Sequence, residues 1–237
     1  MGADLAGLLA VLQLSDSAFP SGRYTLSHGL ETWAQSGRLT TPSDPAVLTA
    51  LLRDHVRLAV GPSDGVALAC AHRAATGPGP VDLGLVRRAD ERLSAVKLSR
   101  EARQTSARTG RALLRVATEA FDAEALSRYA HEVAGKRTPG NHAVALGVLS
   151  GCLGVPRLES VAGELFAFAA SWVAAAVRLA VTDHGTAQAV LRRARRDLGA
   201  AARSAAGRDV ADIRSCAPLL DIMTMRHEET ELRLFAS

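Results

Sequence analysis

The chain has 237 residues, of which 48 % are apolar, so it can bury a sizeable core. Its three cysteines are widely spaced and odd in number, which excludes a disulfide framework and the usual zinc patterns. The net charge of +4 is small for this length, which favours an ordinary solvated surface over a surface that binds nucleic acid. Aromatic residues are only 4 %, while alanine, leucine and arginine are abundant, so the composition favours helices.

In the first half of the chain, apolar residues recur at helical spacing, and glycine and proline residues separate these segments. Pro45 follows a capping residue and marks a helix start. We expect Gly61 and Pro62 to end that helix, because proline cannot continue a regular α-helix, and Ser63 or Asp64 to cap the next one. The helices expected in this half span about 5–12, 26–35, 45–59 and 64–76.

No segment of the chain shows sustained alternation of apolar and polar residues, so no strand is expected in either half. Residues 82–120 contain no proline, which predicts either two helices or one kinked helix. Between Ser99 and Arg111 the predicted helix is polar on all sides. The most apolar stretch, 165–177, is shorter than the roughly 20 residues of a membrane span and predicts a buried core helix. Further helices are expected at about 123–134, 142–153, 160–181 and 186–202, with part loop and part short helix over 217–237.

No linker or internal repeat divides the chain. The sequence therefore predicts one all-α domain over 1–237, with roughly eight to ten helices. Its thiols are expected to be reduced, and the start of the sequence lacks a basic signal-peptide region, which together predict a cytoplasmic protein.

Motifs that carry catalysis are missing from the sequence. There is no phosphate-binding glycine loop leading into Gly-Lys-Ser or Gly-Lys-Thr. The two His-Glu pairs, at His131 and His227, lack the second histidine four residues on that a zinc-protease helix needs. We therefore expect no enzyme activity. His227, beside two glutamates, could hold nickel or zinc, or belong to a tail that docks by charge.

Two other functions are each favoured by one feature of the sequence. Arg192, Arg193, Arg195 and Arg196 would suit a helical nucleic-acid-binding protein, although no DNA-binding motif accompanies them. A helical metalloenzyme using His227, Glu228 and a distant cysteine lacks the paired Glu-x-x-His motif of such proteins.

Three blocks of sequence resemble the urease accessory protein F (UreF) family. The first, residues 12–31, reads LQLSDSAFPSGRYTLSHGLE; the second, 97–110, reads KLSREARQTSARTG; the third, 225–237, reads MRHEETELRLFAS. A weaker block includes Arg178, Leu179 and Gln188. The chain departs from the family pattern at Leu26 and His28, and after Leu179. The blocks occur in the family's order and extend over nearly the whole chain.

The resemblance implies a function in urease maturation. It implies an all-α homodimer that binds the urease accessory protein D/H, recruits the accessory GTPase G and acts on the urease apoenzyme. Nickel would be handled by that complex, with no cofactor bound stably here, and no nucleic acid or membrane partner is expected. A partner-binding tail is expected at 216–237.

The same blocks supply the expected partner-binding residues. Tyr24 would be an interface anchor or an ordinary core tyrosine, Glu101 would pair along its helix with Lys97, and the tail would either order on binding or pack on its own domain. Candidates for a metal are His28, Glu31 and His227. The predicted partner-binding set is Ser15, Asp16, Ser17, Pro20, Gly22, Tyr24, Lys97, Arg100, Glu101, Arg103, Arg226, His227, Glu228, Arg233 and Phe235.

Overall fold

The computed structural model describes residues 5–16, 18–20, 22, 26–77 and 79–228. It is built from helices, which confirms the all-α prediction. In chain order they are α1 (Leu5–Ser15), α2 (Leu30–Gln35), α3 (Pro45–Asp54), η2 (His55–Gly65), α4 (Val66–Thr76), α5 (Leu83–Val96), α6 (Arg100–Ala120), α7 (Glu124–Ala134), α8 (His142–Cys152), α9 (Arg157–Arg178), α10 (His184–Ala206), η3 (Val210–Asp212) and α11 (Pro218–His227).

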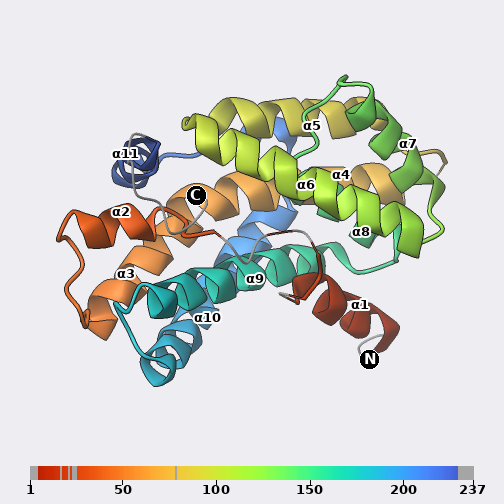
Figure 1. The fold of residues 1–237 in the computed structure, drawn as a ribbon. Coiled ribbons are helices and arrows are strands. Elements are labelled where there is room, and N and C mark those ends of the chain that lie inside the picture. Colours follow the sequence, from red (N-terminus) through yellow and green to blue (C-terminus); the bar gives the residue numbers. More distant parts are fainter. Residues whose placement is uncertain (1–4, 17, 21, 23–25, 78, 229–237) are drawn as a thin grey trace.

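Helix α8 lies behind α6 in the view of Figure 1 and contacts helices on several sides, among them α4, α7 and α9. Every side chain from His142 to Gly151 is buried, because the helix is apolar on all sides and packs against α4 and α6. Helix α9 runs beside α10, and α1 covers one end of α9. The short α11 lies at the edge of the molecule, against α2 and α6.

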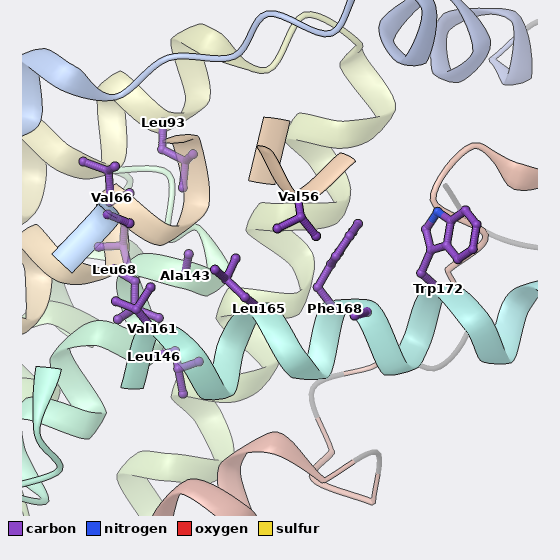
Figure 2. Packing of buried hydrophobic residues seen from close by; sticks show 14 of the residues in the cluster. Val56, Val66, Leu68, Leu93, Ala143, Leu146, Val161, Leu165, Phe168 and Trp172 are labelled. Carbon is purple, nitrogen blue, oxygen red and sulfur yellow. The ribbon is translucent and has the colours of Figure 1, made fainter. Parts of the chain in front are cut away.

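Helix α9 contributes several large side chains to the core. Val161, Leu165, Phe168 and Trp172 recur every three or four residues and point together into the cluster (Figure 2). By length and composition α9 could cross a membrane, but 67 % of its most apolar window is buried inside the protein. The prediction of a buried core helix in this region is confirmed.

The prediction that Gly61 and Pro62 end a helix is wrong. Helices α3 and α4 are joined without a break by the π-helical segment η2, and Pro62 lies inside it. Proline clashes with the carbonyl four residues earlier in an α-helix, whereas the wider π-helical turn accepts it by changing that spacing. Ser63 caps no new helix, because its hydroxyl donates to the carbonyl of Ala59 at 2.8 Å.

Segment η2 also packs closely against α10. A Cβ atom on Gly61 would lie only 3.2 Å from the Cβ of Ala201 and 2.5 Å from the carbonyl oxygen of Val56. The shorter contact lies within η2, so the π-helical backbone itself requires glycine here, and the missing Cβ also lets α10 approach closely. The consequence is a narrow, small-residue floor between η2 and α10.

Asp90 on α5 is a buried hub that fixes the loop before α8. Its carboxylate, fully buried, accepts hydrogen bonds from the Tyr129 hydroxyl at 2.8 Å, the Thr138 hydroxyl at 2.6 Å and the backbone N–H of Gly140 at 2.7 Å. The backbone and side-chain amides of Asn141 donate to it at 2.9 and 2.7 Å. Burial, followed by the Asp90 charge, raises the pKa of Tyr129 well above its ordinary value, so its hydroxyl keeps the donated proton.

Of the two alternatives for residues 82–120, the structure has two helices. Helix α5 ends at Val96, and Ser99 caps α6 by accepting from the backbone N–H of Ala102 at 3.0 Å. The region from Ser99 to Arg111 is not polar all round in its packing, because Ser106 and Thr109 are buried. The Thr109 hydroxyl donates to the helix carbonyls of Thr105 and Ser106 at 2.9 and 3.1 Å, so it is buried with its hydrogen bond satisfied.

Candidate functional site

Helix α11 places the third sequence block against the first two. Pro218 occupies the first turn, where its missing N–H costs nothing. Leu220, Met223 and His227 follow at helical spacing and form the buried inner face. This face packs on α2 and α6, which carry the ends of the first and second blocks.

His227 lies between two carboxylates. Its Nε2 is 3.1 Å from a carboxylate oxygen of Glu31, and its Nδ1 is 2.9 Å from one of Glu101. The side chain of His227 is 0 % exposed, with Glu31 at 1 % and Glu101 at 16 %. We call these three residues the junction, because they join segments 126 and 196 positions apart in the sequence.

A neutral imidazole and two ionised carboxylates have one proton too few for both contacts of His227 to be hydrogen bonds. Neutral histidine has one N–H donor, and an ionised carboxylate only accepts. Both contacts are hydrogen bonds only when the imidazole carries two protons or one carboxyl keeps its own. Removing any member leaves a buried charged or polar group without its partner, which is costly.

Glu228 extends the junction to the start of α6. Its carboxylate accepts from the backbone N–H of Glu101 at 3.0 Å and lies 3.8 Å from the guanidinium of Arg100. A carboxylate at a helix N-terminus is favoured by the unpaired N–H groups and the helix dipole. His227 and Glu228, adjacent in sequence, thus bind two sides of the same helix start.

Glycine at position 29 allows α11 to approach α2. Gly29 has φ of +78°, and a Cβ there would lie 3.3 Å from the Thr224 hydroxyl. The preceding His28 has φ of 52°, its Nε2 is 3.0 Å from the Ser171 hydroxyl, and its ring contacts Phe168 edge-on. His28 is therefore turned towards α9 rather than towards His227.

The candidate metal ligands are not arranged around a common point. Among the residues that the structure describes, no group of three His, Cys, Asp or Glu side chains is placed to hold a metal ion. Glu31 and Glu101 lie on opposite nitrogens of the His227 ring, so the imidazole fills the space between them. His28, the third candidate, contacts Ser171 and Phe168.

The first block forms a turn near the start of the chain. Asp16 accepts from the backbone N–H of Ala18 at 2.7 Å, the geometry of an Asx turn. Ser15 ends α1 and is half-buried, whereas Pro20 and Gly22 are exposed. The predicted contacts at Ser17 and Tyr24 lie outside the described residues.

Lys97 and Arg103 fix the connection between α5 and α6. The ammonium of Lys97 binds both carboxylate oxygens of Asp64 at 2.9 and 2.8 Å, so its predicted pairing with Glu101 is wrong. Glu101 instead reaches His227, because Lys97 precedes the helix that carries Glu101. Arg103 donates to the carbonyls of Lys97 and Leu98 at 2.6 and 2.7 Å.

The outer face of α11 is apolar and exposed. Leu219, Ile222 and Met225 are 43 %, 46 % and 39 % exposed and recur every three residues along one side. Arg226 lies beside them and is also exposed. The tail thus packs on its own domain up to Glu228, and the predicted contacts at Arg233 and Phe235 lie outside the described residues.

The sequence did not predict a cavity of about 190 Å³, which is lined by both apolar and titratable side chains. His28, His55, His142 and Glu164 all line it, with His142 3.7 Å from Glu164. Burial lowers the pKa of His55 to about 4, against the opposing effect of its backbone hydrogen bonds. These residues are scattered along the chain, and no spacing in the sequence could have grouped them.

The protein is thus an all-α protein in which residues of the three sequence blocks, Glu31, Glu101 and His227, meet at one buried junction. The sequence profile of the UreF family matches residues 43–195. Urease accessory protein UreF of Trichodesmium erythraeum is 32 % identical over 237 residues, covering all of both chains. Those of Arthrobacter sp. and Paenarthrobacter aurescens are 33 % and 34 % identical over 229 residues, covering 96–97 % of each chain.

The chain therefore belongs to the UreF family of urease accessory proteins. The UreF family is non-catalytic, so the chain is not an enzyme, in agreement with the prediction from the missing catalytic motifs.

Proposed function

We propose that this chain is a cytoplasmic scaffold that assembles the proteins needed for nickel insertion into apo-urease. It would bind the urease accessory protein D/H and the accessory GTPase G, and act as a homodimer. Membership of the UreF family supports the role in urease maturation. Since the sequence has no phosphate loop, GTP hydrolysis would belong to the partner.

The observation that carries this proposal is the arrangement of α11. The junction holds its inner face against α2 and α6, while its outer face exposes three large apolar side chains, Leu219, Ile222 and Met225. Rigid presentation of apolar side chains lowers the entropy cost of binding. The helix is therefore suited to docking a partner protein, and the D/H accessory protein is the partner that we propose for it.

Docking of a partner on α11 also gives a reason for a polar junction, rather than an apolar contact, beneath this helix. A buried charged cluster contributes little net stability compared with apolar packing, but it specifies one geometry. The helix would thus be held in one register when a partner meets it. Nickel would be handled by the assembled complex, with none bound stably by this chain.

Replacing Ile222 by glutamate tests the docking face. We expect Ile222→Glu to weaken binding of the D/H accessory protein by at least roughly tenfold, because a charge would be buried at the centre of the contact. The measurement is titration calorimetry of the purified chain with the D/H accessory protein from the same operon. Circular dichroism and the unfolding midpoint should not change, since Ile222 is 46 % exposed.

Val47→Glu is the matched control. Val47 is 49 % exposed on α3, so it introduces the same charge at a similarly exposed apolar position outside α11. Binding by Ile222→Glu that equals binding by the wild type and by Val47→Glu would contradict docking through α11.

A further inference from the structure

A second surface of the molecule, distinct from the junction and α11, is strongly basic. A groove of about 520 Å³ runs between η2 and α10. It shares no residue with the junction. Five arginines from three parts of the chain line it: Arg53, Arg57, Arg196, Arg208 and Arg214.

The positive charge of the groove is poorly balanced. Asp197 is the only carboxylate among the lining residues, and it is held by Arg53 at 3.1 Å. Arg208 lies 3.7 Å from Asp212, one turn further along the chain. Within the described part of the chain, no ion pair is formed by the remaining three arginines, Arg57, Arg196 and Arg214. Their exposed guanidinium groups can each bind a carboxylate in a bidentate manner.

The floor of the groove is apolar. It is formed by Gly61, Pro62, Val66, Ala201 and Ala205, where η2 and α10 pack closely. These side chains offer no hydrogen-bond donor, and the arginines stand around them. A free phosphate ligand is best bound where donors converge at the floor of a site, as at a helix N-terminus or nest. A ligand with apolar side chains between its negative charges matches both the floor and the walls.

We propose that the groove between η2 and α10 binds an acidic amphipathic segment of a partner protein. Apolar side chains of the segment lie on the small-residue floor, and its Asp or Glu side chains pair with Arg57, Arg196 and Arg214. The small side chains of the floor let the partner's backbone approach closely. The inference rests on this groove alone and is independent of docking through α11.

A labelled synthetic peptide tests the proposal with the full-length chain. The probe is a fluorescein-labelled helix-forming peptide of about 12 residues, with leucines on one face and glutamates on the other. We expect saturable binding by fluorescence anisotropy in about 0.1 M salt. Affinity should fall in about 1 M salt, because the screening length shortens from about 10 Å to about 3 Å.

Two charge-reversal variants distinguish binding in the groove from non-specific attraction of the peptide to a basic protein. Arg57→Glu combined with Arg196→Glu should weaken peptide binding by at least roughly tenfold. Arg115→Glu combined with Arg128→Glu makes the same change of charge on exposed positions of α6 and α7 and should leave binding within about twofold. Equal losses in both variants, or no binding by the wild type, would overturn the proposal.

Three further ligands test what kind of molecule the groove binds. A peptide of the same composition with scrambled order should bind more weakly, since its leucines no longer share one face. Equal binding of the scrambled peptide would mean that the apolar floor contributes nothing. Tighter binding of tripolyphosphate or of duplex DNA than of the peptide, lost in the groove variant, would replace the proposal with a phosphate or nucleic-acid site.

Discussion

Replacing His227 by alanine should release α11 from the rest of the protein. The change removes the imidazole from between Glu31 and Glu101 and leaves the carboxylate of Glu31, 1 % exposed, without that partner. Breaking a buried charged cluster in this way costs about 3–5 kcal/mol. Because α11 packs mainly on α2 and α6, the loss should appear first as local opening of this helix.

Native-state hydrogen exchange of the α11 amides measures this directly. A loss of that size corresponds to a decrease in protection of roughly two to four orders of magnitude, limited by the protection that α11 has in the wild type. The matched control is His131→Ala, which removes an exposed histidine from the other His-Glu pair and should change stability by less than about 0.5 kcal/mol. Equal protection of α11 in the two variants would contradict the account of the junction.

Replacing Asp90 by asparagine should destabilise the whole domain. Five donors converge on the two carboxylate oxygens, three of them on one oxygen. Asparagine keeps one of the two acceptor oxygens and replaces the other with an N–H₂ group. The donors that faced the replaced oxygen then face another donor. Each buried donor left unpaired costs about 1–3 kcal/mol, so we expect a loss of at least about 3 kcal/mol.

Urea unfolding followed by circular dichroism is the measurement for Asp90→Asn, since urea does not screen charges as guanidinium chloride does. Glu91→Gln, one residue further on and exposed, makes the same chemical change and should leave the midpoint almost unaltered. A midpoint for Asp90→Asn equal to that of Glu91→Gln would show that the hub adds no stability. Asp90→Ala, which removes both acceptors, is expected to give little folded protein.

The helices were predictable because their signals are local. Pro45 after Asp44, Ser99 before α6 and the regular spacing of apolar residues in α9 each act within a few residues. The wrong prediction of a helix end at Pro62 also has a physical cause. Proline ends most α-helices, and whether a chain instead widens into a π-helical turn depends on packing, here against α10.

The junction was only partly predictable. Resemblance to the UreF family selected the blocks that contain Glu31, Glu101 and His227, but it placed His227 in a tail, and helical spacing paired Glu101 with Lys97. Their contact depends on how α2, α6 and α11 pack, over separations of 126 and 196 residues. The lysine partner, Asp64, lies in the segment that was expected to cap a new helix. No local pattern encodes either pairing.

We propose that this chain serves in urease assembly without catalysing a reaction. The most direct test is to express the matching urease operon at limiting nickel, with and without the gene for this chain, and to measure urease activity and apoenzyme level in parallel. We predict that activity collapses without the chain while the amount of apoenzyme stays the same. Unchanged activity at limiting nickel would contradict a role in urease maturation.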